Sequence, residues 1–232
     1  MKIGIIVAMD KEFAQLRSIL DNAVAEHRNH KDFVLGQIGG KEIVLQKCGI
    51  GKVNSAVGAV EMINNYQPDL IISSGCAGGA DTSLEMLDVV VAEECVYHDA
   101  YCGDEQQFGQ IMGMPARYKA SRELIEKALL LNNSEADIKM NVRAGLTVSG
   151  EWFVNRKEKM QSIMDKFPDA TAVDMESCSI AQVCHIYNVP FVSFRVISDV
   201  PLKDTNASQY YDFWSRAAEG SFEVTRHFIQ SL

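Results

Sequence analysis

The strongest constraint on the fold is the apolar run at residues 191–197, which ends at Ser198 and Asp199. Its β-branched and aromatic side chains predict a buried strand. Residues 179–187 precede it and carry apolar side chains at three- and four-residue spacing, which predicts a helix. In an open α/β sheet, ligands bind outside the carboxyl ends of the strands. We therefore expect Asp199 to face a ligand crevice.

A second acidic position stands just before the predicted helix. Residues 172–176 read Ala-Val-Asp-Met-Glu, so Glu176 is expected to face the same crevice as Asp199. A simpler interpretation is that Asp174 and Glu176 lie in the first turn of the helix, where the helix dipole favours carboxylates, and that Asp199 caps the next segment of the chain. The pattern alone leaves both interpretations open.

Composition favours one soluble α/β domain that binds a small molecule. The 232 residues are 47% hydrophobic, which is enough for a single domain spanning residues 1–232. There are 22 Lys and Arg residues against 31 Asp and Glu, a net charge of −9, and no basic cluster is present. Nucleic acid would be repelled, so we expect no nucleic-acid partner.

The cysteines and the N-terminus point to a reducing compartment. Six cysteines occur without a CxxC pair, so we expect buried, reduced thiols, no metal site and no cofactor. The apolar run at residues 4–9 is too short for a signal peptide, and no segment approaches the roughly 18 apolar residues of a membrane span. We expect a cytoplasmic protein with no membrane partner.

The first half of the chain predicts a mixed sheet. Residues 2–8 predict a buried strand, after which Asp10 is expected to cap a helix with Glu12 in its first turn. A carboxylate there is also what the helix dipole alone would favour. Residues 33–38 and 41–47 predict a hairpin with a Gly-Gly turn, which breaks the alternation of strand and helix. Further strands are expected at 69–73, 87–92 and 142–148, and further helices at 56–63, 121–131, 156–164 and 212–232.

Two glycine-containing segments are candidates for close contact with a ligand. Residues 49–54 read Gly-Ile-Gly-Lys-Val-Asn and lack the third glycine of a dinucleotide-binding motif. A tight turn that brings backbone amides and Ile50 to a ligand fits them better. Residues 74–79 carry little side chain and predict a loop that a flat ring or a sugar can approach, or a sharp turn without a ligand.

Two aromatic or titratable positions in predicted loops are also candidates. Phe153 follows Gly150 at a strand end, where it suits stacking on an aromatic ligand or packing in the core. Residues 97–118 look irregular, and a loop of this length is usually functional or at an interface. We expect His98 in this loop to be a surface or interface histidine.

Six motifs in this order resemble those of the bacterial 5'-methylthioadenosine/S-adenosylhomocysteine nucleosidases, members of the purine nucleoside phosphorylase superfamily. They are Met9 with Glu12, the 49–53 turn, the 74–79 segment, Val-Ser-Gly at 148–150, Val-Asp-Met-Glu at 173–176 and Arg-Val-Ile-Ser-Asp at 195–199. The resemblance covers essentially the whole chain. It implies a single-domain phosphorylase/hydrolase-like α/β fold, whose central mixed, twisted, partly barrel-like sheet is flanked by helices, and usually a homodimer.

The resemblance implies irreversible hydrolysis of the N-glycosidic bond, which releases adenine and a 5-thioribose. Asp199 would protonate adenine N7, with Ser198 positioning it. Glu12 would be the general base for water, near Arg195, and its charge disfavours phosphate. Glu176 would bind the ribose hydroxyls. The other implied contacts are Met175 at the sugar, Met9 and Ile50 at the 5' group, Ala77 and Gly78 at base and sugar, Cys76 near the water, and Phe153 and Val154 at adenine.

The chain departs from the family pattern at three places. Cys76 stands where Ser is common, and Asp174 replaces a more usual Glu. The loop at 101–107 lacks the aromatic residue that a partner subunit usually contributes, and Phe108 is the nearest candidate. The 5' preference, including 5'-deoxyadenosine, therefore stays open. A futalosine-type nucleosidase, a phosphate-dependent phosphorylase and a catalytically idle nucleoside-binding protein remain alternatives.

Overall fold

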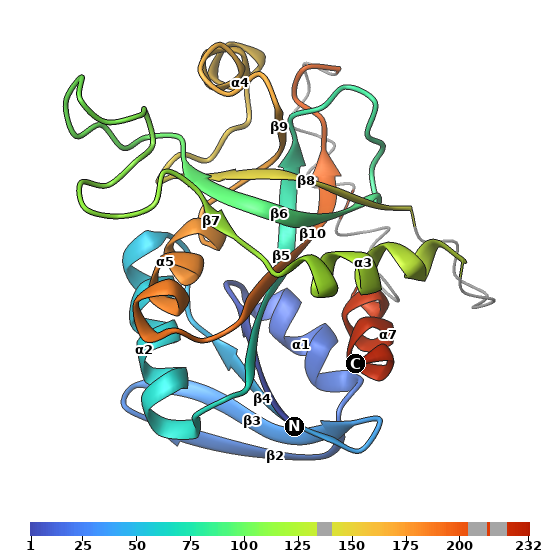
Figure 1. The fold of residues 1–232 in the computed structure, drawn as a ribbon. Coiled ribbons are helices and arrows are strands. Elements are labelled where there is room, and N and C mark those ends of the chain that lie inside the picture. Colours follow the sequence, from blue (N-terminus) through green and yellow to red (C-terminus); the bar gives the residue numbers. More distant parts are fainter. Residues whose placement is uncertain (134–140, 204–212, 214–221) are drawn as a thin grey trace.

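The computed structural model describes residues 1–133, 141–203, 213 and 222–232. Within these residues a mixed ten-stranded sheet is surrounded by helices (Figure 1). The strands are β1 (Lys2–Val7), β2 (Asp21–Arg28), β3 (Lys31–Ile38), β4 (Lys41–Lys47), β5 (Leu70–Gly79), β6 (Val89–Tyr97), β7 (Tyr118–Lys119), β8 (Val142–Ser149), β9 (Ala170–Asp174) and β10 (Phe191–Asp199). The helices are α1 (Asp10–Ser18), α2 (Lys52–Tyr66), α3 (Arg122–Leu130), α4 (Lys157–Met164), α5 (Ser177–Tyr187) and α7 (Glu223–Ser231), with a short 3-10 turn at Leu131–Asn133.

Five strands close into a barrel-like ring. Along the ring, β5 pairs with β10, β10 with β6, β6 with β8, β8 with β9, and β9 again with β5. Three of these pairings are parallel, and β10–β6 and β9–β5 are antiparallel. The predicted mixed, partly barrel-like sheet is confirmed, and the closed ring brings the ends of β5, β9 and β10 together.

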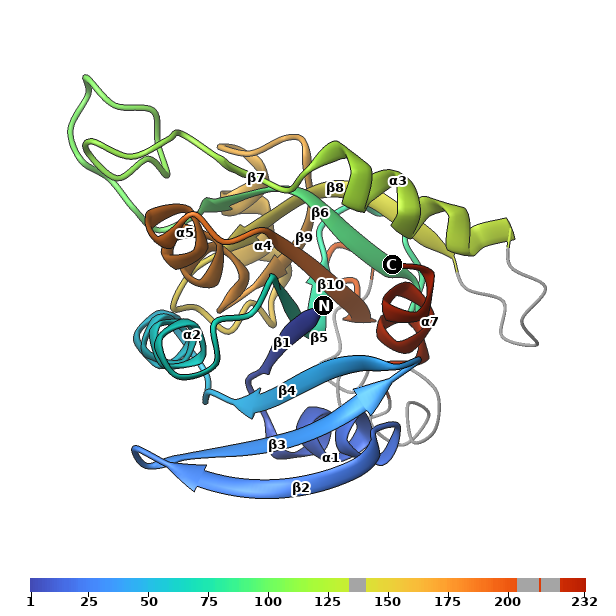
Figure 2. The same cartoon turned by 60° about the horizontal axis from the view of Figure 1, so that its bottom comes forward.

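The sheet continues from β5 through β1, β4, β3 and β2. Of these strands, β4, β3 and β2 lie towards the bottom of the molecule (Figure 2). β1 is parallel to both β4 and β5, whereas β3 and β4 form an antiparallel hairpin. Its turn is Gly39-Gly40, with φ of 56° and 78°, a conformation that glycine adopts without steric cost. The predicted hairpin is therefore confirmed.

The sequence pattern did not predict β2. Its residues are almost all exposed, so they lack the alternation of apolar and polar side chains that marks a half-buried strand. The strand forms because it pairs along its length with β3 at the edge of the sheet. Asn29 and His30 form the connecting turn with φ of 51° and 64°.

Two flanks of the sheet carry separate apolar clusters. α2 and α5 lie side by side on one flank (Figures 1 and 2), where Met62 and Ile180 belong to the same buried cluster. α1, α3 and α7 cover another flank, and Leu16, Ile125 and Phe228 share a second cluster there. Both clusters include side chains of β1, β5 and β10, so the helices pack on two faces of these strands.

Two local predictions are wrong. Residues 74–79, predicted as a loop, continue β5, because pairing with β10 and β9 supplies hydrogen bonds that outweigh the low strand propensity of glycine. Asp10 does not cap α1: the N-cap is Met9, and Asp10 is the first helical residue.

The predicted C-terminal helix and the search for membrane-spanning helices can be assessed only for the described residues. Of the helix predicted at 212–232, α7 occupies Glu223–Ser231, whereas residues 212 and 214–221 lie outside the described residues. In the part of the chain that the structure describes, no helix has the length and apolar character to span a membrane.

Candidate active site

A pocket opens where the ends of β1, β5, β9 and β10 meet the turn at 49–51 and the segment at 150–154. Every site residue predicted from the sequence lines this pocket except Arg195, which lies behind its wall. The lining therefore comes from segments spread over almost the whole chain, which the closed sheet brings together.

Glu12 is buried, with 2% of its surface exposed, and its carboxylate accepts three backbone hydrogen bonds. Oε2 accepts from the N–H groups of Ala8 and Met9, and Oε1 from that of Cys76, all at 3.0 Å. Burial raises the pKa of Glu12, while Arg195 and these N–H groups act in the opposite direction. The side chain is thus held rigidly, as a base that must receive a proton at one place requires.

Arg195 is fully buried and forms the support behind the pocket. Its Nε donates to Asp174 Oδ2 at 2.6 Å, and its Nη2 donates to Ser73 Oγ at 2.8 Å. Asp174 also accepts from Ser177 and from the Ser149 hydroxyl. The buried Asp174 carboxylate is therefore paired with Arg195 and has its remaining hydrogen bonds satisfied. This pairing fixes the Arg195 guanidinium near Glu12.

Glu176 is the N-cap residue of α5 and lies 7% exposed in the pocket. Its Oε1 accepts a hydrogen bond from the N–H of Gly51 at 2.9 Å. Burial raises the pKa of Glu176, and the neighbouring Asp174 raises it further, against the lowering effect of Arg195. The Gly51 N–H holds only Oε1, so a hydroxyl group of a ligand can approach the second oxygen of this carboxylate from the pocket.

Asp199 is the last residue of β10 and directly follows a shift in the register between β10 and β5. The pairing with β5 runs regularly to Ile197, and then slips by one residue before Asp199 pairs with Gly78. Such bulges redirect side chains. The Ser198 hydroxyl donates to Asp199 Oδ1 at 2.6 Å, and it also lies 3.1 Å from the carbonyl oxygen of Ala77. Burial raises the pKa of Asp199, which the Ser198 hydrogen bond partly offsets.

The rest of the pocket wall is apolar or nearly without side chain. Cys76, Ala77 and Gly78 form a flat stretch of β5, as expected for a surface that a ring or a sugar approaches. Phe153 and Ile50 are each 51% exposed at the pocket mouth. The other predicted wall residues are Met9, Met175 and the buried Val154.

Four lining residues were missed. The sequence pattern gives Ala8 only a place at a strand end, names Val173 and Asp174 only as motif positions, and does not single out Trp152, which directly precedes Phe153. The position of Trp152 in the segment after β8 was the available signal.

The prediction for His98 is wrong. Its side chain is 3% exposed, and its ring lies 5.3 Å from that of Trp152, measured between centroids. Neither ring nitrogen has a hydrogen-bond partner among the described residues. Gly150 and Trp152 cover it from a distant part of the chain, so its burial does not follow from the local sequence pattern.

The pocket is thus lined by four acidic side chains, Asp174, which pairs with Arg195, and the three site carboxylates Glu12, Glu176 and Asp199. Burial raises the pKa of each of these three. Such an arrangement suits transfer of a proton to and from a bound ligand and stabilisation of positive charge on it. Among the described residues, no group of three or more His, Cys, Asp and Glu side chains is placed to hold a metal ion.

The chain is similar over its whole length to solved structures of nucleosidases. The chain is 33% identical to a 5'-methylthioadenosine/S-adenosylhomocysteine nucleosidase from Neisseria meningitidis in complex with methylthio-immucillin-A, with a TM-score of 0.92 and coverage of 100% of this chain and 99% of that one. It is 31% identical to the S. pneumoniae nucleosidase with the transition-state inhibitor MT-ImmA, with a TM-score of 0.90 and coverage of 100% and 99%. For the Colwellia psychrerythraea nucleosidase in complex with adenine, the identity is 30%, the TM-score 0.91 and the coverage 100% and 96%.

The family model of the phosphorylase superfamily matches residues 2–230. The match spans the strands, the helices and every segment that lines the pocket. Together with the full-length similarity to solved nucleosidases, it shows that this chain belongs to the phosphorylase superfamily and, within it, to the 5'-methylthioadenosine/S-adenosylhomocysteine nucleosidases.

Proposed function

We propose that this protein hydrolyses the N-glycosidic bond of 5'-methylthioadenosine and S-adenosylhomocysteine, releasing adenine and the 5-thioribose product. The observation that carries the proposal is the convergence of Glu12, Glu176 and Asp199 on one pocket, each with a pKa that burial raises. The relatives solved with adenine and with methylthio-immucillin-A support this choice of substrate class.

Asp199 is the proposed general acid. Cleavage of the bond leaves negative charge on adenine, and a proton delivered to N7 makes the base a neutral leaving group. Burial raises the pKa of Asp199, which favours the protonated form that this step needs. Because Ser198 donates to Oδ1, the other carboxyl oxygen is left to hold the proton. Phe153 stacks on the adenine ring, and the backbone of Val154 binds its edge.

Glu12 is the proposed general base. Its three backbone hydrogen bonds and the nearby Arg195 favour the carboxylate form, which takes a proton from the attacking water. The same negative charge repels phosphate, so the account favours hydrolysis over phosphorolysis.

Glu176 is proposed to bind the ribose hydroxyls through the oxygen that Gly51 does not hold. Its charge stabilises the positive sugar that forms as the bond breaks. Met175 packs beside the sugar, Ala77 and Gly78 line base and sugar, and Cys76 lies next to the water that Glu12 activates. Met9 and Ile50 give the 5'-alkylthio group an apolar contact. The 5'-methyl group of 5'-deoxyadenosine can make the same contact.

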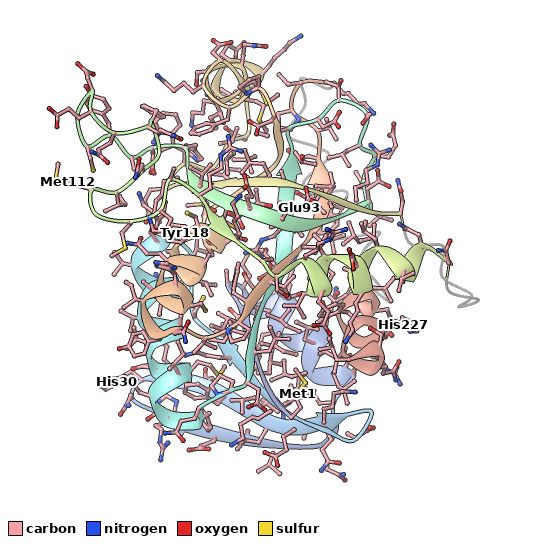
Figure 3. The ribbon with its side chains drawn as sticks, in the orientation of Figure 1. Met1, His30, Glu93, Met112, Tyr118 and His227 are labelled. Carbon is pink, nitrogen blue, oxygen red and sulfur yellow. The ribbon has the colours of Figure 1, made fainter. Side chains whose placement is uncertain are left out.

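We also propose that the single domain of residues 1–232 forms a homodimer in the cytoplasm. Val53 on α2 is 75% exposed, and Ile186 on the neighbouring α5 is 56% exposed. Met112, 67% exposed, lies on a loop that extends from the same side of the molecule (Figure 3). Six free thiols fit a reducing compartment. Light scattering of the wild type and of Val53→Asp tests the dimer, since a buried charge at the interface would yield a monomer.

The test of the proposed function is adenine release from methylthioadenosine by purified protein, first without and then with phosphate. We expect the same rate in both buffers. Release that depends on phosphate would identify a phosphorylase. Release only from a nucleoside with a bulky 5' group would identify a futalosine-type enzyme, and tight adenosine binding without product an idle binding protein.

A further inference from the structure

Glu151, which follows β8, contacts the start of α2 from a distant part of the sequence. Its Oε1 accepts a hydrogen bond from the N–H of Lys52 at 2.7 Å. Its Oε2 would lie 2.6 Å from a Cβ on Gly51, so only glycine leaves room for the carboxylate there. The helix dipole favours a negative charge at this helix start. Glu151 thus joins the segment after β8 to the first turn of α2.

Asp99 closes this contact into a ring. The Lys52 ammonium donates to Asp99 Oδ1 at 2.9 Å and to Oδ2 at 3.0 Å, and the N–H of Glu151 donates to Asp99 Oδ2 at 2.9 Å. Only 10% of the Asp99 side chain is exposed. Although burial raises it, the pKa of Asp99 is held below its usual value by the Glu151 N–H and by Lys52. Lys52, Asp99 and Glu151 therefore bind one another pairwise; we call this ring the latch.

The latch stands directly beside two walls of the pocket. On one side, Lys52 follows Ile50, which lines the pocket, and Gly51, whose N–H holds Glu176. On the other side, Glu151 precedes Trp152 and the base-binding Phe153, which are 45% and 51% exposed. Glu151 is bonded through its carboxylate to the N–H of Lys52 and through its own N–H to Asp99, so the latch restrains the backbone directly before Trp152 and Phe153.

We propose that Lys52, Asp99 and Glu151 are positioning residues that hold the 151–154 segment at a fixed distance from Glu176. This inference rests on the proposed function, in which the 151–154 segment binds adenine and Glu176 binds the ribose. Base and sugar are parts of one rigid nucleoside, so a fixed distance between their binding groups raises its affinity. The latch touches neither Asp199 nor Glu12, so it acts on binding more than on the proton transfers.

The first test is independent of turnover. Hydrogen exchange is followed by mass spectrometry in the wild type, Lys52→Met, Asp99→Ala and Glu151→Ala, all without a nucleoside. We expect faster exchange in residues 150–156 in each variant, and wild-type exchange in Lys52→Arg, which keeps the charge. Lys127→Met removes an ion pair with Glu123 on α3 and serves as the control without effect on this segment. Unchanged exchange in the three latch variants would overturn the inference, whatever the enzyme's substrate is.

The second test measures KM and kcat for adenine release, and adenine binding by calorimetry. We expect KM to rise about tenfold or more in the latch variants, with kcat changed about threefold at most. The Kd of adenine should rise less than KM, because adenine has no ribose and contacts only the 151–154 segment. The double variant Lys52→Met/Asp99→Ala should raise KM no more than the stronger of the two single variants does, because both changes break the same ion pair. Latch variants that lose thermal stability at unchanged KM would show a structural brace and contradict the inference. Failure of the proposed function would instead be seen in the wild type, which would release no adenine.

Discussion

The Glu12 carboxylate and the Arg195 guanidinium face each other at the one point where a side chain on Gly75 would stand. A Cβ there would lie 2.8 Å from Glu12 Oε1 and closer still to Arg195 Nη1. Both side chains are buried and are held by their own hydrogen bonds, so neither can move away freely. Only a residue without a side chain at position 75 therefore leaves room for the proposed base and its neighbouring positive charge where they lie.

Gly75→Ala is expected to cost about 1–3 kcal/mol of unfolding free energy through overpacking, and to abolish most adenine release. Gly4→Ala is the matched control on β1, because its Cβ would meet only the flexible Met62 side chain, at 2.9 Å. Denaturant unfolding and turnover are measured on both. Full activity in Gly75→Ala would show that the distance between Glu12 and Arg195 is not critical.

Glu176→Gln removes the charge and keeps an oxygen for the Gly51 N–H. We expect the rate of adenine release to fall by about 10²–10³-fold, as for loss of other preorganised electrostatic groups. The pKa of Glu176 is raised in the folded protein, so above pH 4.5, its ordinary pKa, the ionised carboxylate lowers the stability of the wild type. Glu176→Gln should therefore be the more stable protein at neutral pH, and its advantage should grow as the pH rises from 4.5. Thermal melts between pH 4 and 8 check this. A variant that is both active and less stable would contradict both roles given to Glu176.

Cys76→Ser puts a hydroxyl in place of a thiol beside Glu12 Oε1, which the Cys76 N–H already contacts. A hydroxyl is the better hydrogen-bond donor, and one such bond is worth about 0.5–1.5 kcal/mol. We expect turnover to rise by about two- to tenfold. Cys102→Ser, in the loop after β6, is the control. An equal or lower rate in Cys76→Ser would show that the thiol does not limit the reaction.

His98 gives a prediction about pH and stability. Burial lowers the pKa of His98 below its ordinary value of 6.5, against the raising effect of Asp99 and Asp174 and with a further lowering by Lys52. Below pH 6.5 the unfolded chain therefore takes up a proton that the folded chain refuses, so this histidine costs stability as the pH falls. His98→Phe should reverse that loss. Unfolding free energies between pH 5 and 8 are compared, and a difference between the two proteins that does not change with pH would contradict the assignment.

The sequence predicts best what short segments decide by themselves. The Gly39-Gly40 turn needs positive φ, which predicts the hairpin. The apolar run before Asp199 fits only a buried strand, so this strand and the position of its end also follow from the local pattern. The positions of Asp199 and Glu176 in the sequence predict that they face one crevice, whereas only the resemblance adds Glu12 to them, since no periodicity brings Glu12 near Asp199. The structure places both on one cavity.

The remaining features depend on partners far along the chain. β5 extends through its glycines because β9 and β10 supply hydrogen bonds, and His98 is buried because Gly150 and Trp152 cover it. Lys52 meets Asp99 across 47 residues. Nothing in the residues around these positions carries that information, which is why the local pattern predicts a surface or interface histidine at position 98 and gives Lys52 no role.

The most direct test of the account compares adenine release from methylthioadenosine by the wild type and by Asp199→Asn, in phosphate-free buffer. The asparagine keeps the size of the side chain and its contact with Ser198, but has no acidic proton to deliver to N7. We expect a fall in turnover of about 10²–10⁴-fold, the usual contribution of a general acid, with an unchanged circular dichroism spectrum. Turnover in Asp199→Asn close to that of the wild type would contradict the central claim that Asp199 protonates the leaving adenine.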